Sequence, residues 1–79
     1  MWNAYILKSS IDNNLYVGST NNIKHRLAEH NSGKVDSTKN RTPLNLEAYF
    51  CVKEQFRAIE LEIYLKTGSG KAFLSKRIL

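Results

Sequence analysis

Three short segments of the chain carry the apolar patterns of β-strands. Trp2–Lys8 places large residues at both odd and even positions, so both faces of this strand are expected to be covered. The second and third predicted strands are Leu15–Ser19 and Leu46–Val52. Turn-forming Asp and Asn residues at 11–14 separate the first two, which predicts a β-hairpin. Gly18 ends the second strand and indicates a bend, a bulge or a close backbone approach.

Three further segments have the composition and the boundary residues of helices: Ile23–Asn31, Gln55–Lys66 and Lys71–Ile78. Thr20, Asn21 and Asn22 are N-cap candidates for the first helix. Gly33 is a suitable residue for the C′ position just beyond its end. Residues 32–43 are polar, which predicts a loop. Residues 67–70 are expected to end the second helix and to separate it from the last one.

The order ββαβαα lacks the regular alternation of a doubly wound sheet, which predicts an α+β fold. We expect a three-stranded, mainly antiparallel sheet flanked by helices, forming a single domain over residues 1–79. The residues expected to be largely buried are apolar members of these elements: Trp2, Ile6, Leu15, Val17, Ile23, Leu27, Phe50, Ile59, Ile63 and Leu65.

The second predicted helix carries two glutamates on different faces. On a wheel of about 100° per residue, Glu62 falls in the middle of the apolar arc, whereas Glu60 falls on the opposite side. An unpaired carboxylate on an apolar face is costly, so Glu62 needs a cation, a donor network or a metal. A structural pair with Lys66, one turn further on, is the simpler interpretation.

The first predicted helix separates its two histidines in the same way. Arg26 and His30 are stacked at i, i+4 beside the apolar stripe, whereas His25 faces water. Tyr5 and Tyr16 fall on the paired strands of the hairpin, where packing is the simplest role and a phenol beside a reacting phosphate is the alternative.

The net charge of +5 and the isoelectric point near 9.6 favour a polyanionic partner. The basic residues gather in two groups, which are either solvated surface or phosphate contacts. The first group is Lys34, Lys39 and Arg41, and the second is Lys66, Lys71, Lys76 and Arg77. One cysteine and two histidines cannot form an internal disulfide or a structural zinc site. No run approaches a membrane span and no signal peptide is recognisable, so we expect a cytoplasmic protein.

Taken in order, these residues resemble the GIY-YIG nuclease superfamily, in its small single-domain bacterial branch related to the nuclease module of the excision-repair incision protein. The two motifs correspond to Asn3-Ala4-Tyr5 and Tyr16-Val17-Gly18, of which the first matches strictly only at its tyrosine. Arg26-x-x-x-His30 and Ala58-x-x-x-Glu62 match the two helices of the family pattern. The late asparagine and the appended DNA-binding domain of some larger relatives have no counterpart.

The resemblance implies a metal-dependent endonuclease that hydrolyses DNA phosphodiester bonds. It implies that Glu62 binds Mg²⁺ or Mn²⁺, that Arg26 clamps the phosphate oxygens, and that Tyr5 acts as general base with Tyr16 and His30 assisting. For this work the pKa of Tyr5 is expected to be lowered by Arg26 and the metal. Contacts to the backbone phosphates of DNA are expected from six surface cations: Lys34, Lys39, Arg41, Lys71, Lys76 and Arg77.

Two other functions stay open at this point. One is a nucleic-acid-binding module with weak or no turnover, and the other is a small basic subunit that binds an acidic protein. The sequence does not choose among duplex, single-stranded, branched or damaged DNA, and it does not reveal a protein partner or an oligomeric state.

Overall fold

The computed structural model describes residues 1–79. The strands are β1 (Trp2–Ser9), β2 (Leu15–Thr20) and β3 (Leu44–Val52). The helices are α1 (Ile23–Asn31), α2 (Gln55–Leu65) and α3 (Gly68–Phe73), and a π-helical segment, Leu74–Ile78, follows α3. This order confirms the predicted α+β fold. None of the helices combines the length and the apolar character needed to cross a bilayer.

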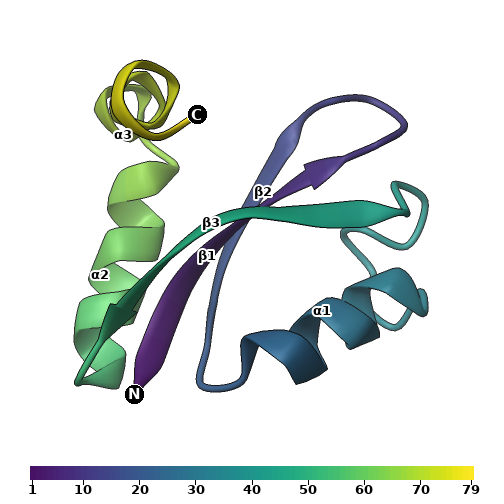
Figure 1. Cartoon of the computed structure of the whole chain (residues 1–79), viewed down its shortest axis with the longest axis horizontal. Helices are drawn as coiled ribbons and strands as arrows, with labels where there is room; N and C mark the ends of the chain where they lie inside the picture. The colour runs from purple at the N-terminus through teal and green to yellow at the C-terminus, as the bar shows by residue number, and fades with distance from the viewer.

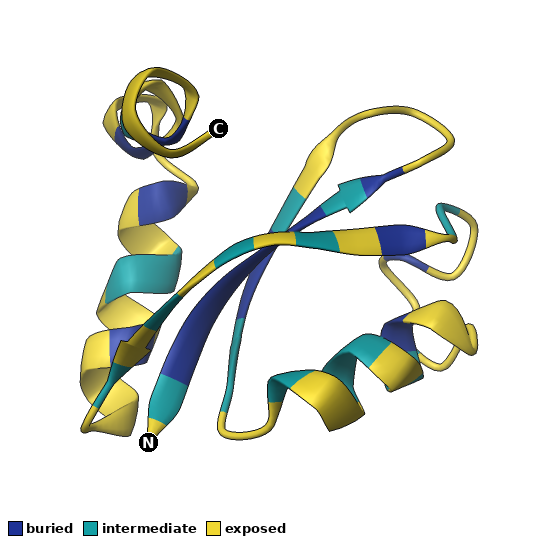
Figure 2. Ribbon diagram, viewed as in Figure 1, coloured by how far each residue is buried: buried dark blue, intermediate teal, exposed yellow.

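The sheet has the order β2-β1-β3, and both neighbours of β1 run antiparallel to it. Tyr5 therefore faces Gly18 of β2 on one side and Tyr49 of β3 on the other. Helices α2 and α3 cover one face of the sheet, and α1 lies against the other (Figure 1). The prediction that both faces of the first strand are covered is confirmed, and Figure 2 shows β1 as the most continuously buried element.

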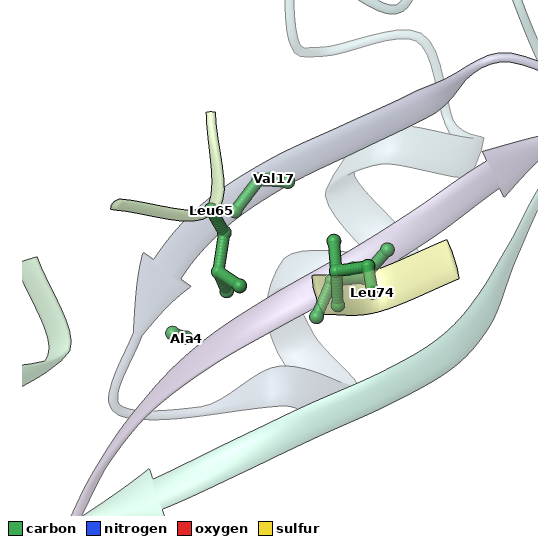
Figure 3. Close-up of a cluster of buried hydrophobic side chains, with 5 residues drawn as sticks. Ala4, Val17, Leu65 and Leu74 are labelled. Carbon is green, nitrogen blue, oxygen red and sulfur yellow. The ribbon is translucent and has the colours of Figure 1, made fainter. Parts of the chain in front are cut away.

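Two apolar clusters lie on opposite faces of β1, because successive side chains of a strand point to opposite sides. The cluster beneath α2 and α3 consists of Ala4, Ile6, Val17, Leu65 and Leu74 (Figure 3). The cluster on the α1 side consists of Tyr5, Leu7 and Leu44, with Tyr16, Ile23, Leu27 and Leu46 packed against it. The alternation along β1 thus separates the structural core from the face that carries Tyr5.

The ends of α1 are built as the sequence predicts. The Asn22 side chain accepts a hydrogen bond from the His25 amide at 3.0 Å, and Gly33 adopts a positive φ of 79° just beyond the helix. An additional anchor is Asn31, whose side chain accepts from the Leu44 amide at 2.7 Å and donates to the Leu44 carbonyl at 3.0 Å. These bonds fix the end of α1 to the start of β3.

Some element boundaries differ from the predictions. Strand β3 begins at Leu44 rather than Leu46, because Leu44 pairs with Ser9 and is buried. The segment 67–70 was expected to separate the last two helices without being helical, but α3 already begins at Gly68. The Thr67 side chain caps this helix by accepting a hydrogen bond from the Gly70 amide at 3.1 Å. The segment predicted as one helix from Lys71 therefore continues α3 and then widens into the π-helical turn.

The predicted core is correct for most of the sheet but wrong at Leu15 of β2 and on one side of α2. Ile6, Val17 and Leu65 are buried, and a second group is partly buried: Trp2, Ile23, Leu27 and Phe50. Leu15, Ile59 and Ile63 are exposed, to 36%, 39% and 62%. The apolar residues of α2 span a wider arc than the sheet can cover, and the helix presents Ala58 and Leu65 to the core.

The approach of α3 to the end of α2 depends on the absence of a side chain at Gly70. A Cβ at this position would overlap the Tyr64 carbonyl oxygen and the Leu65 Cα, whereas a Cβ at Gly68 would meet nothing within 4 Å. We expect Gly70→Ala to lower the free energy of unfolding by ~1–3 kcal/mol or more through overpacking. Gly68→Ala, two residues away, should change it by no more than about 1 kcal/mol, in the stabilising direction. Urea unfolding of both variants tests this, and equal effects would contradict it.

Candidate functional site

Tyr5 lies at the centre of the candidate site, on the α1 side of β1 and only 2% exposed. Its ring lies across Gly18, the residue directly opposite on β2. A Cβ at Gly18 would come within 2.5 Å of the Tyr5 hydroxyl and 2.6 Å of the ring carbon that bears it. Of the three explanations the sequence allowed for Gly18, the structure shows a close approach, made by a side chain rather than by backbone.

A chain of buried hydrogen bonds runs from Tyr5 through His30 to Thr38. The Tyr5 hydroxyl lies 3.0 Å from Nε2 of His30, and Nδ1 of His30 lies 2.7 Å from Oγ1 of Thr38. His30 and Thr38 are both fully buried. A neutral phenol has one proton to donate, and His30 Nε2 is the acceptor in front of it. The tautomer that lets the phenol donate to Nε2 places the ring proton on Nδ1, which then donates to Thr38.

Tyr16 completes an aromatic group around His30. The Tyr16 and His30 ring centroids are 4.9 Å apart with an edge-on geometry, and the Tyr5 and Tyr16 centroids are 6.3 Å apart. Tyr16 is half-buried, so one part of its ring reaches the surface. The two tyrosines and the histidine therefore form one packed unit between β2 and α1.

Arg26 lies one turn before His30 on α1 and is the cation of this unit. Its Nη1 donates to Oε1 of Glu29 at 3.2 Å, and its side chain is about one-third exposed. Hydrogen bonding to Tyr5 is the main cause that raises the pKa of Arg26 above its usual value. The predicted separation of the α1 faces is confirmed, because Arg26 and His30 face the domain while His25 lies in solvent.

Burial sets the proton affinities of the two central groups. It raises the pKa of the Tyr5 phenol, against the opposing hydrogen bond and charge of Arg26. The expectation of a lowered Tyr5 pKa is therefore wrong for the chain without metal or substrate, because removal of the phenolate from water outweighs Arg26. Burial also lowers the pKa of His30, with the charge of Arg26 acting in the same direction.

Glu62 lies on α2, and its negative charge contributes to the raised pKa of Tyr5. Its side chain is 23% exposed, at the border of the buried face rather than in its middle, and Lys66 donates to its Oε2 at 2.8 Å. Glu60 is well exposed and pairs with Arg57 at 3.1 Å. The structure thus contains the Glu62–Lys66 pair that the sequence offered as the simpler interpretation.

The donor set around Glu62 fits one type of metal site. No group of three or more His, Cys, Asp or Glu side chains is positioned to hold an ion. Mg²⁺ commonly binds through one or two carboxylates, with water and substrate phosphate as the other ligands. Lys66 bonds only one of the two carboxylate oxygens, which leaves Oε1 of Glu62 for such a role.

The six predicted surface cations are not equivalent. Arg41 donates to Asp12 at 2.9 Å and to the Asn14 carbonyl at 3.1 Å, so it braces the hairpin turn and is largely covered. Lys39 lies 3.8 Å from Asp36 at the surface. The remaining four are exposed: Lys34, Lys71, Lys76 and Arg77.

Two polar residues that support the site were not among the predicted site residues. Thr38 lies in a polar loop without periodicity, and only the folded chain shows that its hydroxyl meets His30. Asn31 sits at a helix end where Asn is common, and its double bond to Leu44 depends on where β3 begins. Both contacts join segments whose relative placement is a tertiary property.

Comparisons with known proteins identify a family for this chain. The family model described as the GIY-YIG catalytic domain matches residues 1–76. A UPF0213 protein of Bacillus licheniformis is 41% identical over 68 residues, covering 85% of this chain and 69% of the relative. A UPF0213 protein of Staphylococcus haemolyticus is 39% identical over 67 residues, covering 84% and 80%. The solution NMR structure of a UPF0213 protein from Bacillus halodurans superimposes with a TM-score of 0.57 at 29% identity, covering 95% and 83%.

Thr38→Val tests the contribution of the buried hydrogen bond to stability. Valine has nearly the same shape but leaves Nδ1 of the fully buried His30 without its hydrogen-bond partner. We expect the free energy of unfolding to fall by ~1–3 kcal/mol, measured by urea denaturation at pH 7.5. Ser37→Ala, at the exposed neighbouring position, is the control and should change it by no more than about 0.5 kcal/mol. Equal stability of the two variants would contradict the buried contact.

The lowered pKa of His30 predicts a loss of stability in weak acid. Unfolded histidine titrates near pH 6.5, so below about that pH the unfolded chain binds more protons than the folded one. The free energy of unfolding should therefore be constant above about pH 6.5 and fall as the pH decreases toward the pKa of folded His30. NMR titration of the His30 ring should give a midpoint below about 6.5, with His25→Gln used to assign the signals. A midpoint at or above that value would overturn the prediction.

Proposed function

Because the chain belongs to the GIY-YIG catalytic domain family, we propose that it is a metal-dependent endonuclease that hydrolyses phosphodiester bonds in DNA. Membership of this family implies nuclease chemistry on a nucleic acid. The observation that carries the proposal is the packing of Tyr5, Tyr16 and His30 into one unit with a Tyr5–His30 hydrogen bond, beside Arg26, whose charge acts on both Tyr5 and His30. The charge of Glu62 reaches the same phenol from α2.

Glu62 is the proposed ligand of Mg²⁺ or Mn²⁺, through the oxygen that Lys66 leaves open. When bound, the cation supplies positive charge to the phosphate and to the leaving oxygen. Arg26 is the proposed clamp for the non-bridging phosphate oxygens, because its planar guanidinium offers several donors and its side chain reaches the surface.

The protein's own groups offer a route for the proton of the attacking water. The water gives its proton to the Tyr5 oxygen while Tyr5 gives its hydroxyl proton to Nε2 of His30, 3.0 Å away. His30 then carries two ring protons, one of which stays bonded to Thr38. The water oxygen forms the new bond to phosphorus, and the bond to the leaving oxygen breaks. Tyr16 holds the His30 ring from the side.

Glu62→Gln should abolish metal-dependent cleavage while the chain stays folded. The amide keeps the size of the side chain but removes the charge that attracts a divalent ion. Because the lost Glu62–Lys66 pair is partly exposed, its removal should change the free energy of unfolding by no more than about 1 kcal/mol. Glu60→Gln, which removes an exposed carboxylate from the same helix, is the matched control and should retain cleavage. The measurement is nicking of supercoiled DNA with Mg²⁺ or Mn²⁺, accompanied by thermal melts.

The outcomes separate the competing functions. Full activity of Glu62→Gln would remove the metal assignment, and equal losses in both variants would undo the distinction between the two glutamates. A wild type that binds DNA in a salt-sensitive way but never cuts it with either metal would favour the nucleic-acid-binding module. Absence of DNA binding even at low salt would leave a protein-binding subunit.

A further inference from the structure

A groove lies beside the candidate site. One wall is the start of β2, and the other is formed by the end of α2, by α3 and by the start of the π-helical segment. Its volume is about 500 Å³, within the usual range of small-ligand sites. The lining runs along residues 13–17 on one side, and the side chains of Leu65 and Leu74 contribute on the other. Strand β2 is an edge of the sheet, bonded only to β1, so no further strand closes this side.

The lining combines an apolar surface with positive charge. Leu15, Val17, Leu65 and Leu74 are apolar, and Lys66 and Lys71 are the charged groups. No carboxylate belongs to the lining. The ligand that matches this pattern has a flat or apolar body and an anionic group, which is the chemistry of a nucleotide.

Two residues connect the groove to the candidate site. Tyr16 lines the groove, and its ring also packs against His30 at a centroid distance of 4.9 Å. Lys66 lines the groove, and its ammonium bonds the Glu62 carboxylate at 2.8 Å. A nucleotide in the groove is therefore adjacent to the place where the phosphate would be cut.

We propose that the groove holds one unpaired nucleotide of the DNA strand next to the scissile phosphate. The inference rests on the proposed nuclease function and narrows its substrate class to DNA with an unpaired base at the cut. In a paired duplex the bases are stacked inside the helix, and extrusion of one costs free energy that an unpaired base does not require. Asn13 and Asn14, whose side-chain amides each carry a donor and an acceptor, lie at one end of the groove for the edge of the base.

The mixed lining fits two other kinds of ligand less well. One is an acidic ligand without an apolar body, and the other is an apolar peptide without charge. The former would leave the exposed side chain of Leu15 in contact with water, and the latter would leave Lys71 without a counter-charge. A nucleotide satisfies both parts of the lining at once.

The test compares binding of two fluorescein-labelled DNAs by anisotropy in EDTA, where no cutting occurs: a paired duplex, and the same duplex with one extra unpaired adenine. The wild type should bind the second about tenfold more tightly. Lys71→Ala and Leu15→Ala, which change exposed lining residues, should reduce this preference to less than about threefold. The controls Lys53→Ala and Ile11→Ala make the same substitutions at exposed positions outside the groove and should retain it.

Equal affinity of the wild type for the two DNAs would overturn the inference, and so would equal effects of the lining and control variants. The nuclease proposal is judged separately, by nicking with Mg²⁺ or Mn²⁺. Cutting of paired DNA without any binding preference would refute the groove and leave the nuclease. A binding preference that depends on Lys71 and Leu15, without cutting of either DNA, would support the groove and refute the nuclease.

Discussion

The burial of β1 on both faces is the constraint from which the rest of this structure follows. A strand that is covered on one face can turn its polar residues to water, but β1 has no such face, and its alternation divides the molecule into two halves. Ala4 and Ile6 form the core with α2 and α3, so Tyr5 must point to the α1 side. The Tyr5 hydroxyl is therefore buried and needs a hydrogen-bond partner within the protein. Gly18 on the neighbouring strand leaves the space for the Tyr5 ring.

The partners come from segments that are distant in sequence. His30 is fixed because Asn31, the next residue, is tied to both backbone groups of Leu44, and Thr38 reaches His30 from the loop between them. No buried side-chain nitrogen or oxygen is left without a hydrogen-bond partner. A fully satisfied buried network holds its side chains in place, because rotation of any one of them would break a hydrogen bond. The site is thus held by the same bonds that close α1 onto the sheet.

The sequence predicts the parts of this arrangement that depend on local pattern. The hairpin, the first two helices, the caps of α1 and the separation of Arg26 and His30 from His25 follow from periodicity and end residues, and the structure confirms them. The last helix was predicted to start at Lys71 and starts instead at Gly68. The exposed side of α2 was not predictable, because its apolar residues extend over more of the helix than one sheet face can cover. Packing against the sheet selects Ala58 and Leu65, leaves Ile59 and Ile63 in solvent, and places Glu62 at the border. The direction of the Tyr5 pKa likewise depends on depth of burial, which spacing does not give.

The raised pKa of Tyr5 and the lowered pKa of His30 both look unfavourable for the proposed proton path. The pKa of Tyr5, however, does not enter the overall proton transfer. Tyr5 gains one proton and loses another, so the net transfer runs from water to His30. The proton affinity of the phenol does not enter the free energy of that net transfer, although it affects the barrier. What matters is the basicity of His30, which burial reduces most and the positive charge of Arg26 reduces further. A phosphate bound by Arg26 would neutralise that charge and raise the proton affinity of His30. In the proposed reaction, the substrate itself therefore improves the base, and the free chain keeps His30 neutral and ready to accept a proton.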